Sequence, residues 1–230
     1  MYFLKKNYVI KKNFIPKKNL LNFEKELTSI INQIIRSNKL AISNKCSLDL
    51  KLMCLEEINH KYISLIYSKI KDTNFFKELL GNKSLKIFLK KTFKKKNELN
   101  TKAVRFDLPN NHKWNLTWHQ EYSYTDKSQK NKDYLIMWFP LLNPNNQYSG
   151  GLEILDRFTD KHYDFSIIKK KNSQIQREPK KMIKNKDKDI KHIMLKLGDI
   201  LIFDKYLFHR SVANISHKAK LTGVISFISN

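Results

Sequence analysis

Two short stretches, Thr117-Trp118-His119-Gln120-Glu121-Tyr122 and Phe208-His209-Arg210-Ser211, decide how the rest of this sequence is interpreted. On an extended strand, residues two apart point to the same face, so His119 and Glu121 can present an imidazole and a carboxylate to one point. His209 is the candidate for a second imidazole. Two histidines and one carboxylate on one face of a metal are typical of non-haem Fe(II) sites, which keep coordination positions open for co-substrate and oxygen. The two stretches therefore predict an iron site.

The residues around these stretches predict a β-rich second half. After about Thr101, helical spacing gives way to short apolar or alternating runs bounded by Asn, Pro, Gly and Asp. We predict strands near residues 103–108, 116–122, 134–142, 152–155, 193–197, 200–203, 207–209 and 221–228. Gly150-Gly151 predicts a turn. Eight short strands suggest a double-sheet barrel or jelly roll.

The first hundred residues predict mainly helices, after a short strand at residues 8–10. Apolar side chains recur at helical spacing in four segments, which are residues 20–36, 47–71, 72–80 and 84–92. Gly81 can stop the third of these helices. No domain boundary is evident, so we predict one domain over residues 1–230, with a helical lead-in up to about residue 100 and a jelly-roll core from 101 to 230.

A basic insertion interrupts the predicted strands at about residues 161–190. It carries ten Lys or Arg, four Asp or Glu and few apolar residues. Such a segment is predicted to be a long loop without secondary structure, serving either as a solvated insertion or as a substrate lid.

Composition narrows the class of protein. The 230 residues are 41% hydrophobic and carry a formal net charge of +24, which fits a folded domain with a basic surface. Only five of the 45 basic residues are arginines, which argues against specific nucleic-acid readout. Two cysteines, no secretion signal and no apolar stretch of membrane-spanning length predict a cytoplasmic protein without a membrane span. The oligomeric state stays open.

Several motifs together resemble the phytanoyl-CoA dioxygenase-like (PhyH) family of Fe(II)- and 2-oxoglutarate-dependent oxygenases. They match in order and spacing, and they are Trp118–Glu121, Leu135–Leu141, Leu197–Phe203, His209–Ser211 and Asn214–Ser216. The opening segment, residues 7–16, is similar as well, so the resemblance covers nearly the whole chain. It implies a double-stranded β-helix, which is a jelly-roll variant, with the leading helices packed on one sheet. It also implies Fe(II), 2-oxoglutarate and O2 as the reagents of a hydroxylation that releases succinate and CO2.

The resemblance also implies roles for single residues. The metal ligands would be His119, Glu121 and His209, and the 2-oxoglutarate-binding residues would be Lys220, Ser211, Gln120 and Trp138. The family usually has Asp in place of Glu121 and Arg in place of Lys220. Lysine supplies a positive charge but not the planar fork with which arginine orients a carboxylate.

The substrate is less constrained by the sequence. Arg105 could face the pocket and hold a substrate acid, or it could lie at the surface, and Tyr124 could line the pocket. We expect a small-molecule or biosynthetic substrate, and the basic surface favours an anionic one. The alternatives are a catalytically degenerate jelly roll that binds an anion or a nucleic acid, and an oxygenase whose outcome is desaturation, epimerisation or ring formation.

Overall fold

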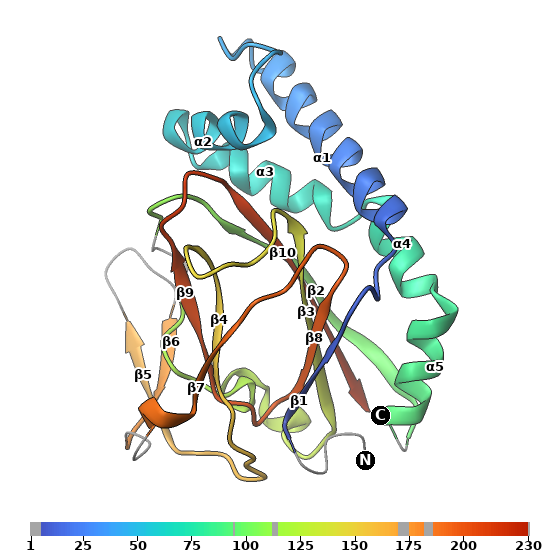
Figure 1. Cartoon of the computed structure of the whole chain (residues 1–230), viewed down its shortest axis with the longest axis vertical. Coiled ribbons are helices and arrows are strands. Elements are labelled where there is room, and N and C mark those ends of the chain that lie inside the picture. The colour runs from blue at the N-terminus through green and yellow to red at the C-terminus, as the bar shows by residue number, and fades with distance from the viewer. Residues whose placement is uncertain (1–5, 94, 112–114, 170–174, 182–185, 230) are drawn as a thin grey trace.

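The computed structural model describes residues 6–93, 95–111, 115–169, 175–181 and 186–229. Within these ranges a helical lead-in precedes a β-rich remainder, as predicted (Figure 1). The α-helices are α1 (Lys17–Ser37), α2 (Leu48–Ile58), α3 (Lys61–Ile70), α4 (Asn74–Gly81) and α5 (Lys83–Thr92). The strands are β1 (Tyr8–Lys11), β2 (Asn97–Asp107), β3 (Tyr134–Leu142), β4 (Ser149–Leu155), β5 (Phe165–Lys169), β6 (Ile175–Pro179), β7 (Ile190–Ile193), β8 (Ile200–Asp204), β9 (His209–Asn214) and β10 (Lys220–Ser229). None of the helices in the described ranges is long and apolar enough to cross a membrane.

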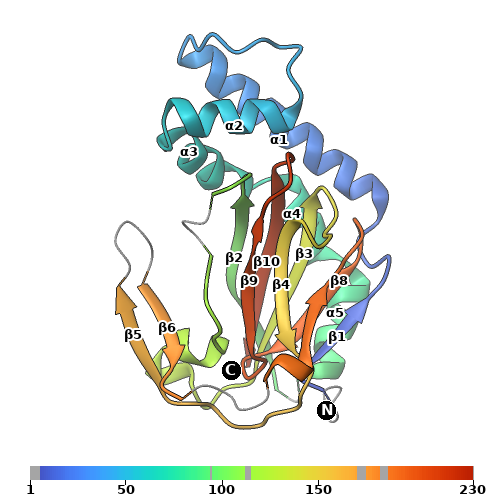
Figure 2. The same cartoon turned by 60° about the vertical axis from the view of Figure 1, so that its left-hand side comes forward.

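The strands form antiparallel sheets of unequal size. The larger sheet has the order β1-β8-β3-β10-β2, and the smaller one has the order β7-β4-β9. Strands β5 and β6 form a separate hairpin, which extends away from the two sheets in Figure 2. The prediction of a mainly β fold with helices is confirmed.

Both faces of the larger sheet pack against other parts of the domain. One face packs on the helices, and the other faces the smaller sheet across the inter-sheet space. On one face Phe139 packs against the helices, with its ring centroid 6.4 Å from that of Phe75 in α4. On the other face Trp138 shares a second core with Ile154 of the smaller sheet. Because neighbouring residues of a strand point to opposite faces, Tyr134–Leu141 of β3 is buried throughout. The larger sheet therefore lies between the packed helical layer and the inter-sheet space.

The helix predicted over residues 47–71 is divided in two. Asn59 has an extended backbone, and its side-chain Oδ1 accepts a hydrogen bond of 2.9 Å from the Lys61 N–H. Such local bonds of Asn compete with continued helix, so α2 ends at Ile58 and α3 begins at Lys61. The predicted stop at Gly81 is correct, and Asn82 then caps α5.

Four predictions about strands and turns are wrong at least in part. Residues 116–122 make one isolated bridge, at His119, instead of a strand, and they continue into the 3-10 helix η1 (Glu121–Tyr124). The strand predicted at 193–197 is β7, three residues earlier, and the one predicted at 207–209 begins only at His209. Gly150 and Gly151 lie inside β4 with φ of +79° and +133°, so they are not a turn.

The basic insertion is more ordered than its composition predicts. Its described residues include β5 and β6, paired from Phe165↔Pro179 to Lys169↔Ile175. Side chains of β6 fix the hairpin to the domain, since Gln176 Nε2 donates to the Asn115 carbonyl at 2.9 Å. The prediction of a structureless loop is therefore wrong, because backbone pairing and a few polar contacts replace the missing apolar contacts.

Candidate metal centre

Backbone pairing brings the two predicted motifs together. The His119 N–H donates to the His209 carbonyl, and the His209 N–H donates to the His119 carbonyl, each at 3.0 Å. The Ser211 N–H donates to the Leu116 carbonyl at 2.9 Å, so residues 116–119 run antiparallel beside β9. As a result the two imidazole centroids lie 4.2 Å apart, although ninety residues separate them in sequence.

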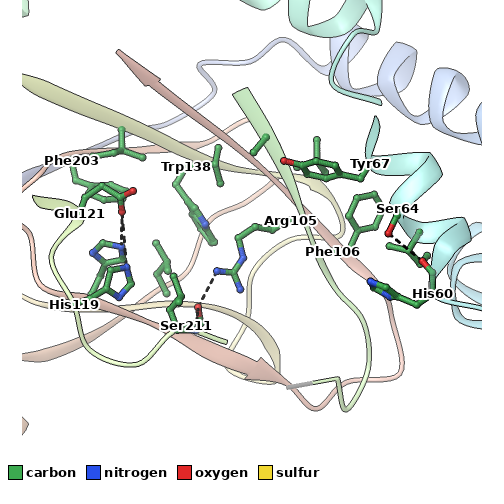
Figure 3. A pocket seen from close by; sticks show the side chains of 18 residues that line it. His60, Ser64, Tyr67, Arg105, Phe106, His119, Glu121, Trp138, Phe203 and Ser211 are labelled. Atoms are coloured by element: carbon green, nitrogen blue, oxygen red, sulfur yellow. Dashed lines mark hydrogen bonds and ion pairs between the residues drawn. The ribbon is translucent and has the colours of Figure 1, made fainter. Parts of the chain in front are cut away.

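Glu121 completes the cluster from the first residue of η1. Its Oε2 lies 4.0 Å from His119 Nε2 and 3.9 Å from His209 Nε2. The three ligand atoms all lie within 4.8 Å of one another, an arrangement able to hold a metal ion (Figure 3). The 3-10 turn η1, and not a strand, directs the Glu121 carboxylate towards the two imidazoles. The three predicted residues nevertheless lie together.

Hydrogen bonds and aromatic rings fix the orientation of both imidazoles. His119 Nδ1 lies 2.7 Å from the Thr117 carbonyl, and His209 Nδ1 lies 3.0 Å from the Leu207 carbonyl. A histidine that donates from Nδ1 directs the Nε2 lone pair to the opposite side, which here is the centre of the cluster. The Tyr124 ring packs edge-on against His119, with centroids 5.3 Å apart.

Burial sets the protonation of the cluster. It lowers the pKa of His119 well below the usual range, and the neighbouring His209 lowers that pKa further. Burial also lowers the pKa of His209 to about 4, so both imidazoles are neutral at pH 7, as metal binding requires. Burial also raises the pKa of Glu121 to about 7. A bound cation would stabilise the carboxylate and reverse that shift.

The cluster opens into a cavity of about 460 Å³ that reaches helix α3. Figure 3 shows the metal cluster at one end, Arg105 in the middle and His60, Ser64 and Tyr67 of the α3 region at the other end. Arg105 faces this cavity, which settles the choice between pocket and surface. Its Nη1 donates to Ser211 Oγ at 3.0 Å, and its Nη2 donates to Asp107 Oδ1 at 2.9 Å.

Lys220 is buried beside this cavity with an exposed fraction of 0%. Its Nζ lies 4.7 Å from the Trp138 ring centroid, and it has no hydrogen-bond partner among the described residues. The pKa of Lys220 is lowered to about 7, mainly by burial; Asp107 opposes this shift and Arg105 adds to it. A buried ammonium without a hydrogen-bonded partner is costly, so this position favours an anionic ligand.

Two of the predicted site residues have other positions. Like Lys220, Gln120 and Tyr124 are not among the described residues that line the cavity, and unlike Lys220 their polar groups already have partners. The Gln120 amide donates to the Lys161 and Tyr206 carbonyls at 2.9 and 2.7 Å and accepts from the Tyr163 N–H at 2.9 Å. Its hydrogen-bonding groups are thus used to fix the chain around residue 161, and its position does not support the predicted co-substrate contact. Tyr124 instead supports His119 and accepts the Arg177 N–H. Ser211 and Trp138 do line the cavity.

Sequence reasoning missed several residues around the cavity. Asn145 and Thr222 are buried with polar atoms that lack partners in the described part of the chain. Asn145 lies in an Asn- and Pro-rich segment that predicts only a turn, so the sequence does not separate it from the neighbouring turn residues. His60, at the start of α3, lines the far end of the cavity and pairs with Glu56 at 2.6 Å. Helical spacing alone does not reveal which turn of a helix meets a cavity.

Comparisons with known proteins locate the fold. The sequence matches no protein-family model and no curated protein sequence. The structure is similar to the non-heme monooxygenase ThoJ, with a TM-score of 0.64 and 11% identity over 99% of this chain and 75% of ThoJ. It is also similar to SnoN, a non-heme alpha-ketoglutarate-dependent epimerase from nogalamycin biosynthesis, with a TM-score of 0.57 and 10% identity over 98% of this chain and 78% of SnoN. The structure is also similar to EvdO2 from Micromonospora carbonacea var. aurantiaca, which was solved in complex with 2-oxoglutarate. The TM-score is 0.55, and the identity is 12% over 99% of this chain and 88% of EvdO2. At such identities the likeness establishes a shared fold.

Proposed function

We propose that this chain is an Fe(II)- and 2-oxoglutarate-dependent dioxygenase with a jelly-roll core of the double-stranded β-helix type. The observation that carries the proposal is the convergence of His119, Glu121 and His209 on one end of a cavity. The shared fold supports it, since ThoJ is described as a non-heme monooxygenase, SnoN as a non-heme alpha-ketoglutarate-dependent epimerase, and EvdO2 was solved with 2-oxoglutarate.

The residues present fit both reagents. Two neutral imidazoles and one carboxylate are the facial donor set of non-haem Fe(II) oxygenases. The buried ammonium of Lys220, without a hydrogen-bonded partner in the described part of the protein, suits the distal carboxylate of 2-oxoglutarate. When bound, iron would supply the oxidation, in which 2-oxoglutarate, O2 and a substrate C–H bond give succinate, CO2 and an alcohol, with one oxygen atom entering each of the succinate and the alcohol.

The remaining cavity residues orient the reagents. Ser211 Oγ accepts hydrogen bonds from Arg105 and from the Leu116 N–H, so its own proton stays available for an oxygen of the bound co-substrate. Trp138 lines the cavity, and the Lys220 ammonium lies over its ring. Backbone pairing of residues 116–119 with β9 keeps both imidazoles in place before any ligand arrives.

The cavity supports a substrate that is largely apolar. Beyond His119, Glu121 and His209 its described lining is mostly hydrophobic, with side chains such as Ile63, Val104 and Phe106. Arg105 is the only Lys or Arg among these lining residues, and Asp107 already pairs with it. This lining favours an apolar substrate over the anionic one that the basic surface suggests. The proposed reaction is hydroxylation of an unactivated C–H bond of a small molecule.

One alternative outcome has specific support. SnoN, an epimerase, and ThoJ, a monooxygenase, share this fold, so the same architecture accommodates different products. The direct test is to supply Fe(II), 2-oxoglutarate and O2 and to measure succinate by chromatography. We expect slow succinate release that requires all three and is lost in Glu121→Ala. Succinate no higher than that of Glu121→Ala would support the alternative of a non-catalytic binding protein.

A further inference from the structure

Four buried side chains at one end of the inter-sheet space carry polar atoms without partners. They are Lys220, Thr222, Trp138 and Asn145, with exposed fractions of at most 5%. In the described residues, no hydrogen bond reaches Lys220 Nζ, Thr222 Oγ1, Trp138 Nε1 or either amide atom of Asn145. Native proteins rarely leave several such groups together, because each one loses its hydrogen bonds to water. This cluster, called the cradle below, is therefore suited to a polar ligand.

The cradle is assembled from both sheets. Lys220 and Thr222 are two residues apart on β10, opposite Asp107 and Arg105 of β2, and so lie on one face. Gly151 of β4 faces them from the smaller sheet. A Cβ added to Gly151 would lie 2.5 Å from Asn145 Nδ2 and 3.3 Å from Lys220 Nζ. The amide and the ammonium thus converge on the space that this glycine leaves open.

We propose that Asn145 is a second carboxylate-binding residue, which acts with Lys220 and Thr222 to hold the distal carboxylate of 2-oxoglutarate, and that Gly151 keeps the space for it. This inference rests on the proposed function. An ionised carboxylate only accepts hydrogen bonds, and the cradle offers donors from an ammonium, an amide and a hydroxyl. Separate donors, two on β10 and one in the connection between β3 and β4, orient the carboxylate in place of the fork that lysine lacks.

The charge of the cradle agrees with an anionic ligand. A water molecule could satisfy the hydroxyl or the amide, but it could not neutralise the ammonium of Lys220. Asp107, which faces Lys220 across the β2–β10 pair, is already bonded to Arg105. Burial lowers the pKa of Lys220 to about 7, and a carboxylate bound beside it would raise that pKa again.

The proposal makes Asn145→Asp a tethered mimic of the ligand. The new carboxylate would occupy the cradle and pair with Lys220. We expect the melting temperature without ligand to rise by several degrees at pH 7 and the Kd for 2-oxoglutarate to rise at least 100-fold under anaerobic Fe(II). Asn145→Ala should raise the same Kd about tenfold, as for the loss of one hydrogen bond to a charged group. Stoichiometric Fe(II) binding should stay unchanged in both variants.

Two controls separate the cradle from general effects. Asn146→Asp adds the same charge one residue further, at an exposed position whose side-chain oxygen accepts from the Tyr148 and Ser149 N–H groups, and it should bind 2-oxoglutarate as the wild type does. The probe 2-oxopentanoate has a methyl group in place of the distal carboxylate. Its Kd should be the same in the wild type and in Asn145→Ala.

The outcomes are distinguishable. Wild-type affinity for 2-oxoglutarate in Asn145→Asp would overturn the proposal, whatever happens to its melting temperature. Equal loss of affinity for 2-oxoglutarate and 2-oxopentanoate in Asn145→Ala would also overturn it, since the defect would not concern the distal carboxylate. If the wild type binds Fe(II) but neither 2-oxo acid, the proposed function itself fails.

Discussion

The two ends of the inter-sheet space are prepared for their ligands in opposite ways. At the metal cluster, His119 and His209 have their Nδ1 atoms bonded to carbonyls and their backbones bonded to each other. At the cradle, Lys220 and Asn145 are buried with no hydrogen bond to their side chains within the described structure. The fold therefore holds the proposed metal ligands in place through its own hydrogen bonds, whereas in the proposed cradle a bound anion would supply the hydrogen bonds that are missing. Mutations of the metal cluster should therefore affect iron binding. Mutations of the cradle should affect both 2-oxoglutarate binding and the free energy of unfolding.

The largest expected effect is at the metal cluster. Replacing His209 by Ala removes one of three converging donors, so we expect His209→Ala to lose stoichiometric Fe(II) binding, which can be measured by anaerobic dialysis and metal analysis. His217→Ala, at an exposed position, should keep full iron occupancy. Full occupancy in His209→Ala would mean that the third ligand is a different residue.

The next effect concerns the cradle alone. Lys220→Ala removes the only ammonium of the cradle, so we expect the Kd for 2-oxoglutarate to rise by about 100-fold, as for the loss of a charge-assisted contact. Iron content should change little because Lys220 does not touch the metal cluster. Calorimetry with Fe(II)-loaded protein measures the Kd for 2-oxoglutarate, and metal analysis measures the iron content. Unchanged affinity for 2-oxoglutarate would contradict the role of Lys220.

A stability measurement sharpens the contrast between the two ends. Lys220→Met removes the buried ammonium, and we expect the free energy of unfolding without ligand to increase by about 2 kcal/mol at pH 6. In the wild type the folded pKa of about 7 lies below the ordinary value of 10.5, so the unfolded chain binds more protons between these pH values. Wild-type stability should therefore rise with pH across that window.

The gain in the free energy of unfolding from Lys220→Met, relative to the wild type, is accordingly present in full below pH 7. It shrinks as the pH rises towards 10.5. Urea unfolding of both proteins at several pH values measures this difference. An advantage that does not change with pH would show that the buried ammonium does not titrate in this window.

The smallest effect tests Gln120, whose amide is bonded to the chain near residue 161. Gln120→Ala removes hydrogen bonds to the chain near residue 161, so we expect a loss of about 1 kcal/mol in the free energy of unfolding and faster proteolysis near Lys161. The Kd for 2-oxoglutarate should stay within about twofold of the wild type. A tenfold weaker co-substrate affinity with normal stability would restore the role that the resemblance implies.

Much of the fold follows from local patterns. The apolar run of β3 and the helical spacing of α1 each specify an element because burial of their side chains requires that geometry. His119 and His209 could be proposed because a His-x-carboxylate pair and a distant histidine match a known donor set. These features are encoded in residue type and spacing.

The remainder depends on contacts between distant parts of the chain. Glu121 reaches the cluster through a 3-10 turn, whose Tyr122 N–H donates to the Lys205 carbonyl, and sequence spacing cannot predict that bond. The β5–β6 hairpin is polar, and Gln176 and Arg177 tie it to Asn115 and Tyr124. Asn145 becomes a candidate ligand-binding residue only because Gly151 leaves space beside Lys220.

The most direct test of the central claim is anaerobic addition of Fe(II) and then 2-oxoglutarate, followed by visible absorption. Both ends of the inter-sheet space must then be occupied by one molecule that chelates the metal and reaches the cradle. We predict a weak metal-to-ligand charge-transfer band that saturates at one iron and one 2-oxoglutarate per chain. Folded, iron-loaded protein that shows no such band with excess 2-oxoglutarate would contradict the account.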